Sequence, residues 1–174
     1  MITPGYVRDM ARYNRWQNRS LYREADRLSD EARRVPRGAF FGSIHATLSH
    51  LLFGDQAWMY RFTGLHQPKA KSIAESTTMV AEWEDLKRQR VEFDDVIVGW
   101  ADGLDAEWLD SDLIWTSAAV NKTLTRPRWL LVSHMFNHQT HHRGQVHCML
   151  TQLGMKPDDT DLPFMPADEG GRAD

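Results

Sequence analysis

The feature that most constrains the fold is an apolar run over residues 129–153, which ends at Gly154 and is followed by Pro157. A glycine just past the last periodic residue and a proline soon afterwards are typical of a helix C-terminus. Five of the chain's eight histidines lie in this predicted helix: His134, His138, His141, His142 and His147. His134, His138 and His142 share one stripe, because each i, i+4 step turns only about 40° beyond a full turn. Two imidazoles at that spacing on an inward face can bind one metal ion.

Three further helices are predicted from the periodicity of apolar residues, over residues 3–28, 43–62 and 77–104. The polar segment 65–76 is expected to be a loop, and β-branched residues at 113–124 predict a short extended excursion around Asn121. Four long helices with little strand between them predict an all-α fold, a four-helix bundle.

A chain of 174 residues is expected to form one domain, which we place at residues 1–166. Residues 155–165 are expected to pack loosely on the bundle, and residues 167–174 to form a frayed C-terminal tail.

The second predicted helix offers the third metal ligand. His50 lies on one stripe with Ala46, Gly54 and Ala57, and these small residues would let a neighbouring helix approach the imidazole. His45 lies nearer the start of the helix and His66 lies in a predicted loop, so both are weaker candidates. The sequence therefore favours His50, His138 and His142 as a set of metal ligands, although buried, hydrogen-bonded histidines would give the same pattern.

Three neutral imidazoles leave a divalent ion with its full charge and an open coordination position, which is typical of a catalytic site rather than a structural one. His138 and His142 also have the histidine spacing of the HExxH metalloproteases. However, Gln139 occupies the position of their general-base glutamate, and an amide cannot take up a proton at neutral pH. The sequence therefore excludes that peptidase mechanism.

Four other residues are candidates for supporting roles. His134 could be a fourth ligand, could contact a ligand, or could simply pack in the core. Gln145, near His142, could orient a ligand or a bound water, and Arg143 could form a salt bridge or bind an anionic substrate. Asp55 is a candidate for substrate contact or for support of a ligand.

The charge and composition exclude several classes of protein. The net charge is −3 and no basic stripe is present, which argues against binding to nucleic acid or to an anionic membrane. No apolar segment is long enough to cross a bilayer, and the single cysteine, Cys148, is expected to be an inert core thiol. A protein without a disulfide framework suits a reducing compartment, so we expect a cytoplasmic protein.

Three stretches together resemble the DinB/YfiT-like family of metalloenzymes, called damage-inducible DinB proteins. They are residues 11–18 (ARYNRWQN), 47–58 (TLSHLLFGDQAW) and 137–145 (NHQTHHRGQ), in the order and spacing of that family. The resemblance implies a four-helix bundle with one crossover connection, commonly assembled as a homodimer. It also implies a divalent metal ion, nickel or zinc in most cases, bound by the residues that here are His50, His138 and His142.

The same resemblance suggests a function. Members of the wider superfamily include thiol S-transferases that use bacillithiol or mycothiol and a mycothiol-dependent isomerase, in which the metal is thought to activate the thiolate. We therefore expect a metal-dependent enzyme that acts on a small molecule, with a low-molecular-weight thiol as co-substrate. The alternative is a metal-binding dimer in a stress response without catalytic turnover. The family often has glutamate where this chain has Gln139, so a role that needs a carboxylate beside the metal is not expected here.

Overall fold

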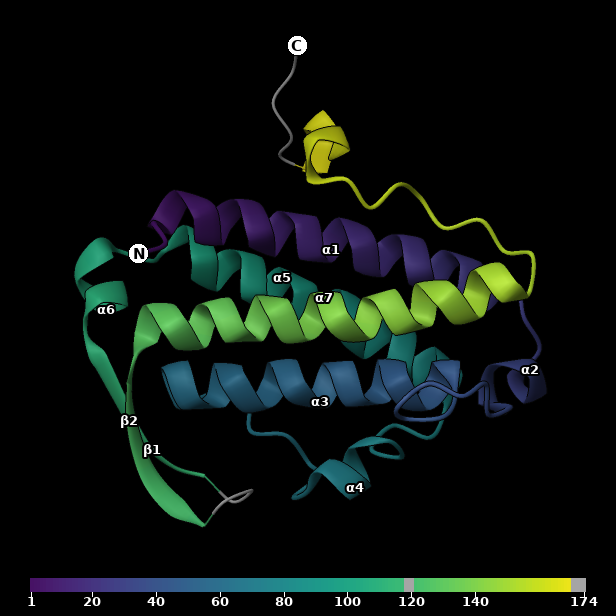
Figure 1. Ribbon diagram of the computed structural model, residues 1–174, viewed down its shortest axis with the longest axis horizontal. Coiled ribbons are helices and arrows are strands. Elements are labelled where there is room, and N and C mark those ends of the chain that lie inside the picture. Colours follow the sequence, from purple (N-terminus) through teal and green to yellow (C-terminus); the bar gives the residue numbers. More distant parts are fainter. Residues whose placement is uncertain (118–120, 170–174) are drawn as a thin grey trace.

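The four long amphipathic segments form the four helices of a bundle in the computed structural model, which describes residues 1–117 and 121–169 (Figure 1). The helices are α1 (Pro4–Asp26), α3 (Ile44–Thr63), α5 (Trp83–Asp102) and α7 (Arg128–Gln152). The side chains of Thr3 and Ser43 cap the N-termini of α1 and α3, and Gly64 ends α3 in the left-handed conformation. The predicted all-α bundle is confirmed.

Each long helix packs on two others: α1 and α3 both contact α5 and α7. Asp102, at the end of α5, pairs with Arg12 in the first half of α1, and Lys87, near the start of α5, pairs with Asp26 at the end of α1. These two helices are therefore antiparallel. His45, near the start of α3, hydrogen-bonds the carbonyl of Val80, just before α5, so α3 and α5 begin at the same end of the bundle. Residues 64–82 therefore run back along α3, and this is the predicted crossover connection (Figure 1).

The crossover segment differs in detail from its prediction. It contains a one-turn helix, α4 (Ile73–Ser76), capped by Ser72, where only a loop was expected. The third long helix begins at Trp83 rather than at residue 77, because Thr77 ends α4 and His45 holds the carbonyl of Val80.

Two short helices and a hairpin complete the connections. The short helix α2 (Asp30–Arg34) follows α1, and α6 (Ala106–Asp110) follows α5. The strands β1 (Asp112–Ser117) and β2 (Lys122–Pro127) form an antiparallel pair with Ser117 opposite Lys122. Asn121 adopts a positive φ of 48°, as suits the residue that ends the turn. The short extended excursion before the last helix is confirmed.

The C-terminal segment is bound to α1 more firmly than its sequence predicts. The Tyr13 hydroxyl donates a hydrogen bond to the carbonyl of Thr160 (2.7 Å), and Gln17 donates one to the carbonyl of Asp159 (2.8 Å). Short 3-10 helices follow at Leu162–Phe164 and Ala167–Glu169. Glu169 is buried and accepts hydrogen bonds from Arg15 and Arg19. In the structure these charge pairs link residues 167–169 to α1, where the sequence led us to expect a frayed tail. Residues 170–174 lie outside the described residues.

The core lies between the four long helices and is formed by aliphatic, methionine and phenylalanine side chains, among them Leu48, Leu52, Ile97, Met135 and Phe136. Within the described residues, no helix combines the length and the apolar character that a membrane span requires.

Candidate metal centre

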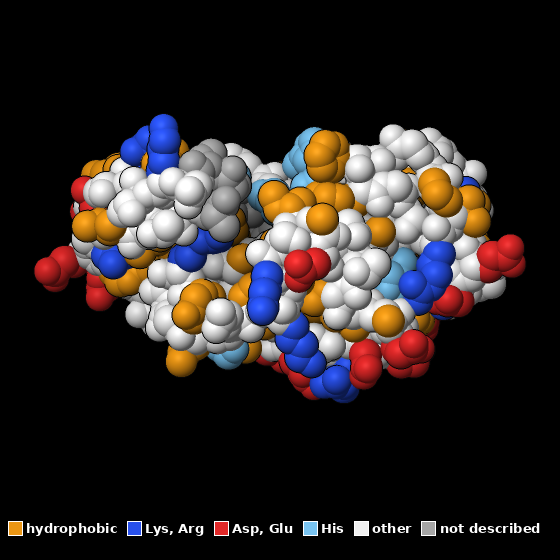
Figure 2. Space-filling view, turned by 90° about the horizontal axis from the view of Figure 1, so that it is seen from below, with side chains coloured by type: hydrophobic (Ala, Val, Ile, Leu, Met, Phe, Trp, Pro, Cys, Tyr) orange, Lys and Arg blue, Asp and Glu red, His pale blue; other side chains and the backbone are white. Residues whose placement is uncertain are grey.

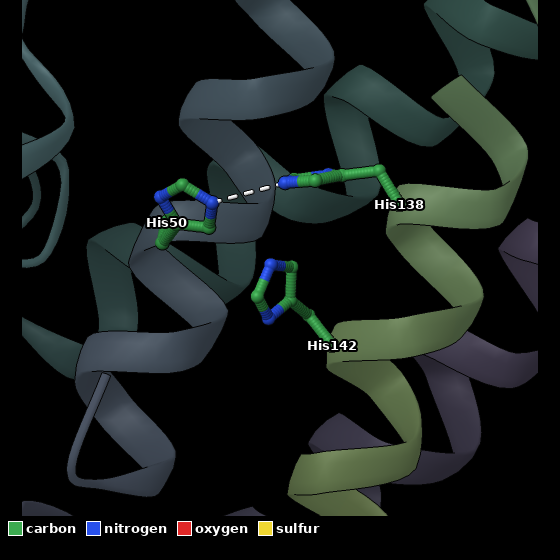
Figure 3. A group of neighbouring side chains, drawn as sticks. All are labelled: His50, His138 and His142. Atoms are coloured by element: carbon green, nitrogen blue, oxygen red, sulfur yellow. Dashed lines mark hydrogen bonds between the residues drawn. The ribbon is translucent and has the colours of Figure 1, made fainter. Parts of the chain in front are cut away.

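Three histidines from two helices converge at one point between α3 and α7 (Figure 3). His50 lies on α3, and His138 and His142 lie one turn apart on α7. One ring nitrogen of each lies within 4.8 Å of the other two, and the Nε2 atoms of His50 and His138 are 3.1 Å apart. Three nitrogens that share one ion at 2.0–2.1 Å in tetrahedral geometry are about 3.3 Å apart. The cluster therefore fits a divalent ion after only a small adjustment.

A glycine lets the two helices come this close. A Cβ atom added to Gly54, one turn after His50, would lie 2.9 Å from the Cε1 atom of His138. No side chain can occupy that position without displacing the imidazole. At Gly54, the stripe of small residues on α3 therefore lets the neighbouring helix α7 approach closely, as the sequence suggested.

Hydrogen bonds set the protonation of two of the rings. The Nδ1 atom of His50 lies 2.8 Å from the Ser76 hydroxyl oxygen, whose own hydrogen is donated to the carbonyl of Ile73. The hydroxyl must therefore accept from Nδ1–H. In the same way, the Nδ1 atom of His142 lies 3.0 Å from the side-chain oxygen of Gln145. Both rings then present an unprotonated Nε2, which is the form that binds a metal.

The environment keeps the three rings neutral. Burial, assisted by the neighbouring His142, lowers the pKa of His50 to about 4. Burial and the other histidines lower the pKa of His138 to about 3, and burial also lowers the pKa of His142. At neutral pH all three imidazoles therefore have a free lone pair, and a proton does not compete for it.

The cluster lies between an aromatic wall and a cavity. The ring of Phe41 lies 3.8 Å from the ring of His50 and 5.1 Å from that of His142, centre to centre. His50 and His138 line a cavity of about 620 Å³, whose other wall residues come from α3, α7, the crossover segment and strand β1. Figure 2 shows histidine surface in the hollow beside the hairpin. A cavity of this size suits a small organic molecule.

Comparison with known proteins identifies the family. The model of the DinB family matches residues 1–171. The chain belongs to the DinB family. It is also 27% identical over 156 residues to "Protein DinB" of Bacillus subtilis (strain 168), a match that covers 86% of this chain and 87% of that protein. The family resemblance inferred from the three sequence stretches is confirmed.

The other candidate residues of this DinB-family chain separate into two groups. His134 lines the cavity and packs edge-to-face on Trp58 at 5.1 Å, outside the cluster of three nitrogens. Gln145 bonds His142, as described above. Arg143 and Asp55, in contrast, are buried in the bundle and do not line the cavity. Arg143 lies over the ring of Tyr13, and burial lowers the pKa of its guanidinium to about 10.

Asp55 belongs to a polar chain that crosses all four long helices. Asn18 donates to Asp94 (2.9 Å), Arg90 pairs with Asp94 (3.0 Å) and Asp55 (2.6 Å), and Gln139 donates to Asp55 (2.6 Å). All five side chains are buried. Gln139 therefore points into the core and not at the histidine cluster. Its position cannot supply a catalytic base, whichever residue occupies it.

Three groups at the site escaped prediction from the sequence. Ser76 lies in the segment expected to be a loop, and no sequence signal places it near His50. Phe41 precedes the second predicted helix and likewise had no signal. Arg61, which lines the cavity, could have been found, because it lies eleven residues after His50 and returns to the same helical stripe. Cys148 is exposed, so the expectation of a core thiol is wrong.

Proposed function

We propose that this DinB-family protein is a metal-dependent enzyme that acts on a small molecule in the cavity beside the three histidines. The proposed reaction is the transfer of a low-molecular-weight thiol to an electrophile. His50, His138 and His142 would bind a divalent ion, with nickel and zinc as the expected metals.

One observation carries the proposal. Among residues 1–117 and 121–169, the three histidines form the only cluster of three or more metal-ligating side chains, and no fourth such side chain joins them. The cluster instead borders a cavity through His50 and His138. A structural metal site is closed by protein ligands, whereas a catalytic site leaves a position for water or substrate.

The residues around the site suit thiol chemistry. A divalent ion bound by three neutral imidazoles would lower the pKa of a thiol and favour the thiolate. Ser76 and Gln145 fix the orientation and tautomer of His50 and His142, and Phe41 excludes water from one side of the cluster. The apolar walls of the cavity, including Phe53 and Trp58, would separate an electrophile from bulk water.

The first test is the metal content of the untagged protein, measured by plasma mass spectrometry beside a His138→Ala/His142→Ala variant. We expect near-stoichiometric metal in the parent and none in the variant. A parent that is empty and takes up neither zinc nor nickel would contradict the proposal.

The second test is catalysis. Monochlorobimane is incubated with cysteine, glutathione, bacillithiol or mycothiol in the presence of metal-loaded parent, metal-free parent or the double variant. We expect faster consumption with at least one thiol in the loaded parent only. Stoichiometric metal without any rate difference would favour the alternative, a metal-binding protein without turnover. The homodimer expected from the resemblance stays a prediction, which sedimentation of the untagged protein would test.

A further inference from the structure

Arg61 lies in the wall of the cavity and pairs with no carboxylate among residues 1–117 and 121–169. It lies near the end of α3, on the stripe of His50, and its guanidinium lies over the ring of Trp58 at 4.6 Å. Burial lowers its pKa, and no acidic group among the described residues opposes that effect. In contrast, four arginines of α1 each pair with a carboxylate: Arg12, Arg15, Arg19 and Arg23. The Arg61 guanidinium is therefore placed to pair with an anionic group of a ligand that enters the cavity.

The whole cavity has the opposite sign of charge from the protein. Its charged wall residues are Arg61 and Lys71, and none of the described residues that line it is acidic. The chain as a whole has a net charge of −3. Any cation bound by the three histidines would add to this local positive charge. A concave site with one sign of charge attracts ligands of the other sign.

The remaining wall is apolar and aromatic. Trp58 and Trp115 meet edge-to-face at 6.1 Å, and His134 also packs edge-to-face with Trp58 at 5.1 Å. Phe53 and Ile73 also line the cavity. Such walls bind a flat or aliphatic body through its apolar surface and leave only the charged group for Arg61.

We propose that the cavity selects small organic carboxylates with a flat aromatic or an aliphatic body, and that Arg61 binds the carboxylate. The guanidinium fork matches a carboxylate in two parallel hydrogen bonds, and Trp58 holds the fork in place by stacking. This proposal deepens the proposed function by naming its substrate class, and rests on that function only for the identity of the site. Arg61 acts here as a specificity-determining residue.

Isothermal titration calorimetry with a matched pair of probes tests the proposal. The probes are 3-phenylpropionate and 3-phenylpropan-1-ol, which share the aromatic body and differ in the charged group. They are titrated into metal-loaded and chelator-treated parent, Arg61→Met, Arg61→Lys and the control Arg8→Met. Arg8 forms no salt bridge among the described residues either, but it lies on α1 and does not line the cavity.

We expect the parent to bind the acid at least tenfold more tightly than the alcohol, with and without metal. Arg61→Met should weaken binding of the acid about tenfold and change binding of the alcohol less than twofold, whereas Arg61→Lys should retain part of the preference. Arg8→Met should bind both probes as the parent does. Circular dichroism and metal content confirm that each variant is folded and loaded.

The proposal would be overturned by no binding of the acid, no preference for it in the parent, an unchanged preference in Arg61→Met, or equal loss of both probes. A preference present only in loaded protein would assign the carboxylate to the metal and would also overturn it. The titration uses no thiol and no turnover, so failure of thiol transfer leaves its result intact. Conversely, thiol transfer by a protein that does not prefer the acid would contradict only the proposed carboxylate selectivity.

Discussion

Gly54 on α3 faces His138 on α7 so closely that a methyl group at position 54 would lie 2.9 Å from the Cε1 atom of the imidazole. The contact joins the two helices that supply the histidine cluster. His138 can occupy its observed position only because residue 54 has no side chain.

Gly54→Ala should therefore separate metal binding from folding. The displaced atom is at the far end of a side chain, so the imidazole can rotate away while the helices stay packed. We expect metal affinity to fall at least tenfold, measured by competition with a chromophoric chelator. Thermal stability of the metal-free protein should change little, because the gain of about 1 kcal/mol from alanine over glycine in a helix offsets the cost of moving the imidazole.

Gly99→Ala is the matched control, because Gly99 lies inside α5 and an added Cβ would meet no atom within 4 Å. It should leave metal affinity unchanged. Equal metal affinity in both variants would show that the close contact does not position His138.

Ser76→Ala should weaken metal binding without altering any of the three histidines. The hydroxyl accepts from Nδ1–H of His50 and thereby leaves the Nε2 lone pair free. Loss of such a partner typically costs 10–100-fold in metal affinity. Thr77→Ala is the control, because within the described part of the chain the Thr77 hydroxyl hydrogen-bonds only the carbonyl of Ala74. If the two variants bind metal equally, the bond to His50 does not affect the site.

The positions of the helices and of the three histidines could be predicted because both follow from helical periodicity. One turn of helix is enough to place His138 and His142 on one face, and the same periodicity places the small residues of α3 on the face of His50. The same stripe extends to Arg61, so part of the cavity wall was also present in the sequence. Family resemblance added the crossover connection, which periodicity alone does not define.

Contacts between distant segments could not be predicted. Ser76 reaches His50 across a crossover whose path depends on how α4 packs against α3. Asp55 lies in the sequence stretch shared with the family, yet its carboxylate bonds Arg90 and Gln139 inside the bundle. An aspartate in a buried ion pair and an aspartate in a functional site look the same in the sequence, and only the packing distinguishes them.

Gln139→Glu tests whether this position belongs to the core or to the site. Its amide donates to Asp55, so the substitution places a second carboxylate against the first in a buried network. We expect a loss of about 3 kcal/mol in the free energy of unfolding at pH 8, typical of an uncompensated buried charge.

The loss should depend on pH in a defined direction. Burial and Asp55 would raise the folded-state pKa of the introduced carboxyl above about 4.3, its value in the unfolded chain. The folded state then retains the proton more strongly than the unfolded chain does. Stability therefore falls as pH rises from the unfolded-state pKa to the higher folded-state pKa, and the loss is smaller at pH 5 than at pH 8. Gln139→Met, which removes the hydrogen bond without adding charge, provides the reference at each pH. A loss that is the same at pH 5 and pH 8 would contradict this account.

The metal-free protein should lose stability as the solution becomes more acidic. In the unfolded chain, histidine takes up a proton near pH 6.5, whereas burial lowers the pKa of His50 to about 4 and of His138 to about 3 in the folded state. Between pH 6.5 and these values only the unfolded state gains protons, so the free energy of unfolding falls as pH falls. From pH 7.0 to pH 5.5, the parent should lose about 2.5 kcal/mol relative to a His50→Leu/His138→Leu variant, which lacks both groups. Urea denaturation of the two proteins in the presence of a chelator measures the difference, and parallel stability profiles would show that the two imidazoles are not desolvated in the folded protein.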